Sequence, residues 1–156
     1  IFSKRLYDMQ HQEIPALSHY VPAHEGPEDE LAKTFPLQLI TWKGKNRANS
    51  TQYANPWLIE AQQQKLWINP QDAQKRGIAQ GDTVRIHNAR GICEIPAEVT
   101  PRIIPGVVAM QAGAWWQPDE KGIDKGGCAN VLSSARITAL AKGNSHQTML
   151  VEVAKA

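Results

Sequence analysis

Short apolar runs, each ended within a few residues by glycine, proline or asparagine, constrain the fold of this chain more than any other feature. Most of these runs alternate apolar with polar residues or are rich in β-branched side chains, which is the pattern of β-strands. We therefore expect strands at residues 37–42, 66–68, 83–87, 93–99, 107–110 and 149–153. Many short strands joined by turns favour a small closed β-barrel with helical insertions, because closure leaves no sheet edge unpaired.

Turn and cap residues separate these strands. Asn55 and Pro56 predict a short helix that continues to about Gln64, since asparagine is a good N-cap and proline suits the first turn. Residues 69–77 repeat this start and end in a glycine that favours a left-handed exit, so a second short helix is expected there. Residues 88–91 predict a hairpin turn, and Pro96 predicts an edge or a bulge in the strand that follows.

The first 36 residues differ in character from the rest. Residues 14–36 hold four prolines and a run of acidic residues without sustained periodicity, which is typical of an extended linker. The chain begins at Ile1 rather than methionine, so we expect it to be a piece of a longer protein. The folded body should begin at Leu37 and continue to residue 156.

Composition excludes some classes of protein. With 156 residues the chain has room for one domain, and its net charge of +2, with cations scattered apart from one short cluster, favours no class of partner. Its two cysteines are too few for a disulfide framework and cannot form a zinc site alone. No apolar run is long enough for a membrane helix.

The loop at residues 41–51 combines three cations with a glycine, two asparagines and three hydroxyl residues. An anionic ligand such as a pyrophosphate needs this mixture, because the cations supply charge, hydroxyls and amides supply direction, and glycine permits close backbone approach. A solvated basic surface loop would have the same composition, and that alternative remains open.

Two further polar regions could contact a ligand. Trp115 and Trp116 would face opposite sides of a strand, so one ring could stack on a planar ligand or a neighbouring domain, or one could be buried while the other covers the surface. Asn130 and Gln147 lie in glycine-containing loops, and an amide that both donates and accepts suits the edge of a heterocycle such as a pterin. Simple turn formation would also explain such residues.

Catalytic chemistry has little support in the residues themselves. Cys128 and His146 could form a nucleophilic pair, but no helix N-terminus or recognisable signature surrounds the cysteine. Histidines and acidic residues show no metal-ligand spacing and no acid–base pairing. By themselves these residues support a β-rich domain that binds a small anionic or heterocyclic ligand.

The order of several short motifs is more specific than any one of them. The 41–51 loop is followed by Trp-Ile-Asn-Pro-Gln-Asp-Ala at 67–73, Gly-Asp-Thr-Val at 81–84, Arg-Gly at 90–91, Ile-Pro-Gly-Val-Val at 104–108 and Asn-Val-Leu-Ser at 130–133. This series resembles the C-terminal molybdopterin dinucleotide-binding domain of the dimethyl sulfoxide reductase family. Residues 43–47, 113–116 and 126–130 are most similar to the catalytic subunit of the anaerobic, membrane-associated dimethyl sulfoxide reductases.

The resemblance implies a mostly β domain with short helices, a six-stranded double-psi β-barrel at residues 37–156, preceded at 1–36 by the end of another domain and a linker. It implies that the barrel clamps one side of a bis(molybdopterin guanine dinucleotide) molybdenum cofactor. Asn49 occupies a neighbourhood in which many family members have a histidine. The cofactor-binding residues implied by position, or expected from the loops above, are Thr41, Trp42, Lys43, Gly44, Arg47, Asn49, Ser50, Thr51, Trp115, Asn130 and Gln147.

The resemblance also implies that the chain contains no catalytic residue and no metal ligand. The molybdenum ligand and an iron–sulfur cluster would belong to upstream domains, so the chain alone should lack turnover. The whole enzyme would reduce S- or N-oxides with electrons from a quinol. It would work with an iron–sulfur subunit and a membrane anchor subunit at the cytoplasmic membrane.

Two other hypotheses stay open at this point. A stand-alone barrel could use the tryptophan pair and the basic loop to hold a protein or a nucleic acid. A small hydrolase could use Cys128 as its nucleophile.

Overall fold

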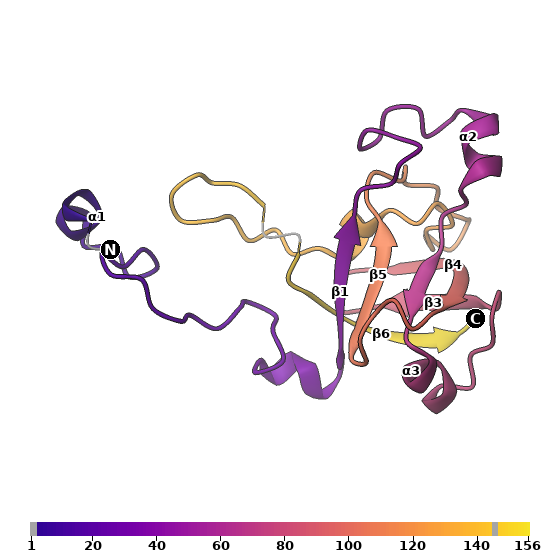
Figure 1. Ribbon diagram of the computed structural model, residues 1–156, viewed down its shortest axis with the longest axis horizontal. Helices are drawn as coiled ribbons and strands as arrows, with labels where there is room; N and C mark the ends of the chain where they lie inside the picture. Colours follow the sequence, from indigo (N-terminus) through magenta and orange to yellow (C-terminus); the bar gives the residue numbers. More distant parts are fainter. Residues whose placement is uncertain (1–2, 145–146) are drawn as a thin grey trace.

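The computed structural model describes residues 3–144 and 147–156. Six strands form a closed barrel in the order β1-β5-β2-β4-β3-β6 (Figure 1). The strands are β1 (Leu37–Trp42), β2 (Leu66–Ile68), β3 (Thr83–His87), β4 (Ile92–Val99), β5 (Val107–Gln111) and β6 (Met149–Lys155). The short helices are α1 (Lys4–Met9), η1 (Glu30–Lys33), α2 (Pro56–Ala61), α3 (Pro70–Lys75) and η2 (Ala129–Leu132). The expected six-stranded barrel with short helices is confirmed.

Two parallel pairs set the shape of the barrel. β1 runs parallel to β5, and β2 runs parallel to β4, whereas the other neighbours are antiparallel. Because Trp42 at the end of β1 pairs with Gln111 at the end of β5, the loops that leave these strands emerge at the same end of the barrel. The start of β6 also lies here, since Met149 pairs with Leu39.

Pro96 lies where β4 changes neighbours. It pairs with Thr83 in β3, and the pairing of β4 with β2 begins only at Ala97. A proline has no N–H to donate, so this junction accommodates it without losing a ladder hydrogen bond. The strand therefore continues through Pro96 to Val99.

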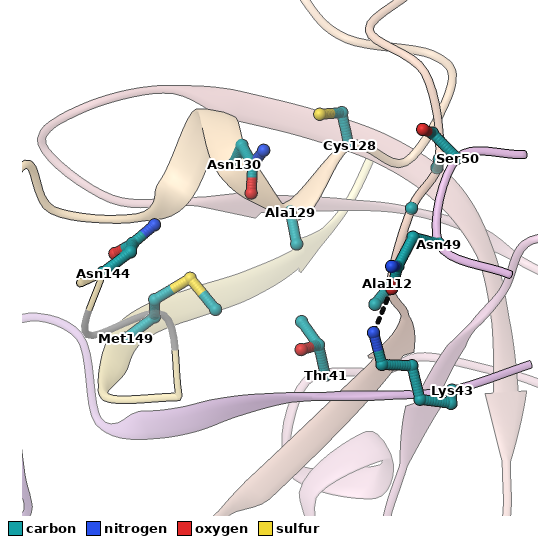
Figure 2. A pocket seen from close by; sticks show the side chains of 12 residues that line it. Thr41, Lys43, Asn49, Ser50, Ala112, Cys128, Ala129, Asn130, Asn144 and Met149 are labelled. Atoms are coloured by element: carbon teal, nitrogen blue, oxygen red, sulfur yellow. Dashed lines mark hydrogen bonds between the residues drawn. The ribbon is translucent and has the colours of Figure 1, made fainter.

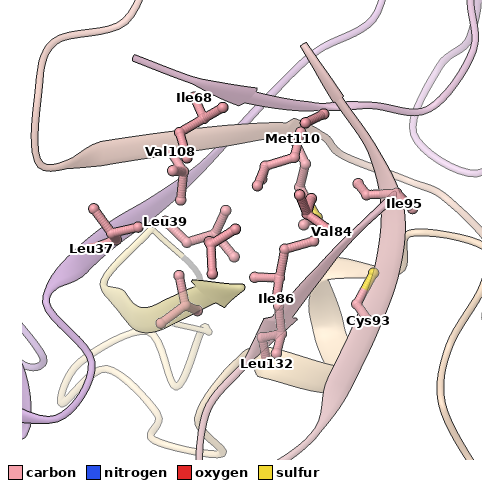
Figure 3. Close-up of a cluster of buried hydrophobic side chains, with 14 of the residues drawn as sticks. Leu37, Leu39, Ile68, Val84, Ile86, Cys93, Ile95, Val108, Met110 and Leu132 are labelled. Atoms are coloured by element: carbon pink, nitrogen blue, oxygen red, sulfur yellow. The ribbon is translucent and has the colours of Figure 1, made fainter. Parts of the chain in front are cut away.

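Alternating strand residues fill the barrel interior (Figure 3). Val84 and Ile86 of β3 are fully buried, while Thr83 is exposed and Arg85 is partly exposed, as the period of a half-buried strand requires. The core is completed by Leu37, Leu39, Leu66, Ile68, Cys93, Ile95, Val108, Met110, Leu132 and Val151. Side chains occupy the centre, so a ligand can bind only at the barrel's ends or outside.

Helix α3 follows its sequence signals closely. The Asn69 side chain accepts a hydrogen bond from the Gln71 N–H and also donates to the Ile103 carbonyl at 2.7 Å. Gly77 has a φ of 64°, which is the left-handed exit expected at this position.

Helix α2 ends at Ala61, earlier than the expected Gln64. Gln62 is already extended, and the Gln64 side chain donates to the carbonyls of Gln111 and Gly127. These long-range contacts hold the chain out of helical geometry after Ala61.

Residues 3–36 form an N-terminal arm that extends from the barrel at the start of β1 (Figure 1). It carries α1 and η1 and is otherwise irregular. Glu25 departs from a plain linker, because its side chain is only 2% exposed and contacts the barrel. No helix within the described residues has the length and apolar character needed to cross a membrane.

Candidate functional site

A cavity of about 360 Å³ opens at the end of the barrel where β1 and β5 finish (Figure 2). Four parts of the chain that are distant in sequence supply its walls: residues 41–50, residues 112–114, residues 128–130, and Asn144 with Met149. Five residues expected from the sequence to bind cofactor line it, namely Thr41, Lys43, Asn49, Ser50 and Asn130. The other lining residues, which were not expected from the sequence to bind cofactor, are Ala112, Gly113, Ala114, Cys128, Ala129, Asn144 and Met149.

Backbone contacts fix the first loop over the end of β5. Asn49 has a φ of 55° and Gly113 a φ of 88°, both in the left-handed region. A Cβ on Gly113 would lie 2.0 Å from the Asn49 carbonyl oxygen, so only glycine allows these two loops to meet. Within the loop, Lys43 Nζ donates a hydrogen bond to Asn49 Oδ1, which directs the ammonium group into the cavity (Figure 2).

Gly44 has a different role from the one expected. A Cβ at this position would overlap the Gln111 side chain, at 1.3 Å from its Nε2 atom. Gln111 is 1% exposed and donates from Nε2 to Asn46 Oδ1 at 2.7 Å. The glycine therefore makes room for a buried amide of the protein rather than lining the cavity.

Gln147 contacts Thr41 with both ends of its amide. Its Oε1 accepts from the Thr41 N–H at 2.8 Å, and its Nε2 donates to Thr41 Oγ1 at 2.8 Å and to the Thr41 carbonyl at 3.2 Å. The predicted site residue Gln147 thus lies beside the cavity and holds the end of β1 against the segment before β6.

Trp115 follows the lining residue Ala114 and contacts the first loop without lining the cavity itself. Its Nε1 donates to the Ser50 carbonyl at 3.0 Å, and its ring stacks on Tyr53 with centroids 5.7 Å apart. Trp115 and Trp116 are 50% and 62% exposed and belong to a loop, so neither ring is buried in the core. Tyr53 in turn donates to the Gly126 carbonyl at 2.9 Å, which connects the two stacked rings to the loop at residues 126–130.

Trp42, Arg47 and Thr51 lie outside the cavity lining. Trp42 packs on Trp67 with centroids 5.0 Å apart. Arg47 donates to Gln64 Oε1 at 2.5 Å and lies over the Tyr53 ring, and burial lowers the pKa of its guanidinium. Lys43 is therefore the cation of the first loop that faces the cavity.

Asp124 organises the loop that carries Cys128, and sequence reasoning missed it. Its carboxylate is fully buried and accepts from the N–H groups of Gln117 at 2.8 Å, Gly126 at 3.1 Å and Cys128 at 2.6 Å. An aspartate two residues before a glycine pair is a signal for a local turn, but nothing local indicates burial.

The cavity thiol is protonated at neutral pH. Burial raises the pKa of Cys128, and burial together with the nearby Asp124 carboxylate raises that of Cys93. A thiol of this kind is a poor nucleophile. His146, the partner considered for Cys128, lies outside the described residues.

The chemistry of the lining suits an anion with a polar edge. Among the lining residues that the structure describes, none is acidic, and they carry one ammonium, two hydroxyls and three carboxamides. Ammonium and hydroxyl groups can donate to phosphate oxygens, and carboxamides can both donate and accept along a heterocycle. Among residues 3–144 and 147–156, no group of three potential protein ligands could hold a metal ion.

Comparisons with known proteins agree on the kind of domain. The family model described as Molydopterin dinucleotide binding domain matches residues 37–150. Dimethyl sulfoxide reductase DmsA of Escherichia coli (strain K12) is 52% identical over 143 residues, which is 91% of this chain and 17% of that protein. DmsA of Haemophilus influenzae is 46% identical and covers 86% of this chain and 17% of its own length. A trimethylamine-N-oxide reductase of Haemophilus influenzae is 39% identical and covers 86% of this chain and 18% of its own length.

The chain thus spans less than a fifth of the length of these relatives. Among solved structures, acetylene hydratase from Pelobacter acetylenicus superposes with a TM-score of 0.75 at 15% identity. That match covers 99% of this chain and 23% of the hydratase, and at this identity it concerns the fold.

Proposed function

Because this chain belongs to the molydopterin dinucleotide binding domain family, we propose that it clamps such a cofactor for a dimethyl sulfoxide reductase-type enzyme. The observation that carries the proposal is the convergence of five sequence-expected residues on one cavity, from loops up to 89 positions apart in the chain (Thr41 to Asn130). Convergence from separate loops is what a shared ligand requires, whereas unrelated surface loops would not need to meet.

The donor set fits a dinucleotide. Lys43 would meet a phosphate oxygen, with the hydroxyls of Thr41 and Ser50 beside it. Asn130 would pair with the polar edge of the pterin, which needs both donors and acceptors. Gln147 and Trp115 would act one step away, by holding Thr41 and the Ser50 backbone in place.

Most of the enzyme lies in other parts of the protein under this proposal. Residues 37–156 form the cofactor-binding domain, and residues 1–36 are the end of a preceding domain and a linker. When bound, the molybdenum cofactor supplies oxygen-atom and electron transfer, and this chain contributes binding, orientation and exclusion of water. The proposed cofactor is bis(molybdopterin guanine dinucleotide), and the other domains of the same subunit complete its site.

The proposed substrates are S- and N-oxides, and the support is the family of reductases to which the relatives belong by name. An iron–sulfur cluster in an upstream domain would deliver electrons. An iron–sulfur subunit and a membrane anchor subunit would connect the enzyme to the cytoplasmic membrane. No nucleic acid is a proposed partner.

Substitution of the two neighbouring lysines tests the proposal. In the full-length protein, Lys43→Met should lower the guanine nucleotide released per chain, because a charge-assisted hydrogen bond contributes about 1.5–3 kcal/mol. By that estimate, retention of the cofactor should weaken by roughly 10- to 100-fold. Lys45→Met is the matched control, since this lysine is exposed two residues along and does not line the cavity.

The outcome separates the hypotheses. Loss of nucleotide in Lys43→Met alone supports a cofactor site. Wild-type protein that contains no guanine nucleotide would contradict the proposal. Salt-sensitive binding of single-stranded DNA that weakens equally in both variants would instead favour a nucleic-acid module.

A further inference from the structure

The N-terminal arm places a buried carboxylate against the barrel. Glu25 is 2% exposed, and both its oxygens are paired with Arg90: Nη1 donates to Oε1 and Nη2 to Oε2, each at 2.8 Å. The Leu150 N–H also donates to Oε2, at 3.2 Å. A two-pronged pair of this kind fixes orientation as well as distance.

Arg90 and Asn88, in the turn between β3 and β4, both donate to the carbonyl of Leu132, the last residue of η2. The Leu132 carbonyl accepts from Arg90 Nε at 2.9 Å, from Arg90 Nη2 at 2.7 Å and from Asn88 Nδ2 at 2.8 Å. Asn88 Nδ2 also donates to the Leu150 carbonyl at 3.2 Å. The β3–β4 turn is therefore bonded to two segments and, through Glu25, to the arm.

The two segments that accept these bonds, η2 and the start of β6, both contribute residues to the cavity wall. Leu132 ends η2, whose first two residues line the cavity, and its side chain is anchored in the core (Figure 3). Leu150 follows Met149, another lining residue. The turn also touches η2 directly, because a Cβ on Gly91 would lie 2.6 Å from the Val131 carbonyl oxygen.

We propose that Glu25 and Arg90 are positioning residues of the cofactor cavity, through which the arm holds η2 and the start of β6 in place. Neither side chain lines the cavity, so their effect passes through Leu132 and Leu150. This inference rests on the proposed cofactor-clamping function and adds a role for the arm. The guanidinium fork matters because it reaches a carboxylate and a carbonyl together, which a lysine ammonium at the same place does not.

The test uses the full-length protein purified with its cofactor. Glu25→Gln keeps the shape of the side chain and removes one partner of the pair. Arg90→Lys keeps the charge and removes the fork. Glu152→Gln is the matched control, since Glu152 pairs at 2.7 Å with Arg76, the residue that follows α3, and lies outside the cavity lining. The readouts are guanine nucleotide released per chain and hydrogen–deuterium exchange of residues 128–134.

We expect Glu25→Gln and Arg90→Lys each to lose cofactor severalfold and to raise exchange at residues 128–134 by about tenfold, as local opening becomes easier. Glu152→Gln should change neither. Because Arg90→Lys retains a positive charge beside Glu25, loss of cofactor in that variant distinguishes positioning from charge balance.

Two results would overturn the inference. One is full cofactor content in both test variants, which would make the pair merely structural even if exchange became faster. The other is equal loss in the Glu152→Gln control. If the wild-type protein itself contains no guanine nucleotide, the proposed function fails first, so the two failures can be told apart.

Discussion

The buried carboxylate of Asp124 offers the sharpest test of how the cavity wall is held. Oδ1 accepts from two backbone N–H groups, those of Gln117 and Gly126, and Oδ2 accepts from that of Cys128 at 2.6 Å. Replacement of Asp124 by asparagine keeps the shape but turns one oxygen into an NH₂ group. In either orientation of the amide, a donor then faces at least one backbone donor.

The better orientation keeps the two bonds to Oδ1 and opposes NH₂ to the Cys128 N–H. A hydrogen bond to a buried charge contributes about 1.5–3 kcal/mol, and a buried donor left without an acceptor costs about 1–3 kcal/mol. The neutral amide is easier to desolvate than a carboxylate, which offsets part of this loss. A net cost of about 3 kcal/mol follows, and each 1.4 kcal/mol is a factor of ten in an opening equilibrium.

The Cys128 amide should therefore exchange about 100-fold faster in Asp124→Asn than in the wild type, measured by hydrogen–deuterium exchange of the full-length protein. Asp119→Asn is the control, because its side chain accepts from two backbone N–H groups of the same loop, at 2.9 Å each, but is 31% exposed. Water can replace those bonds, so exchange should change little. Equal exchange at Cys128 in the two variants would refute the claim that Asp124 holds this wall.

Three further predictions address the loops, the thiol and acid stability. Gly113→Ala should lower the cofactor content and reduce the free energy of unfolding by about 1–3 kcal/mol, because the new Cβ would lie 2.0 Å from a carbonyl oxygen of the first loop. Gly81 has a similar φ but open space around it, so Gly81→Ala should keep the cofactor. Guanine nucleotide released per chain measures both. Cys128 should react with iodoacetamide at pH 8 far more slowly in the folded than in the denatured protein, because burial raises its pKa; rapid labelling would revive a nucleophilic role. The hydrogen bond from Lys125 is the main cause that lowers the pKa of Glu94 in the folded protein. The ionised Glu94 therefore contributes to the free energy of unfolding above its ordinary pKa of 4.5, and this contribution is lost as the pH falls through the lower pKa of the folded state. In Glu94→Gln, the local stability of β4, measured by hydrogen exchange, should therefore depend less on pH in the acidic range than in the wild type. An unchanged pH dependence would count against this role of Glu94.

The strands could be read from the sequence because their signals are local. Alternation places Val84 and Ile86 inward whatever the neighbouring strand is, and the cap and exit residues of α3 act within one turn of helix. The end of α2 could not be predicted, because the Gln64 side chain bonds to carbonyls 47 and 63 residues away. Long-range hydrogen bonds overrule a weak local preference there.

For the site, the sequence indicated the loops better than the side chains within them. Composition identified residues 41–51, but the direction of each side chain depends on partners from other loops. Arg47 turns toward Gln64 and Tyr53, and Gly44 makes room for Gln111. The positioning groups carry no local pattern at all.

The walls of the cavity are held by hydrogen bonds between the protein's own side chains. Lys43 is held by Asn49, and Thr41 is held by Gln147, so the groups proposed to meet the cofactor are already ordered by neutral protein partners. Ordering them costs conformational entropy during folding rather than during binding, which favours tight retention of a large ligand. A phosphate oxygen can replace the neutral amide beside Lys43 and gain a charge-assisted bond, so the exchange favours the bound state. This advantage exists only while the loops keep their positions relative to one another. Buried groups outside the cavity that hold the loops therefore contribute to binding without touching the ligand.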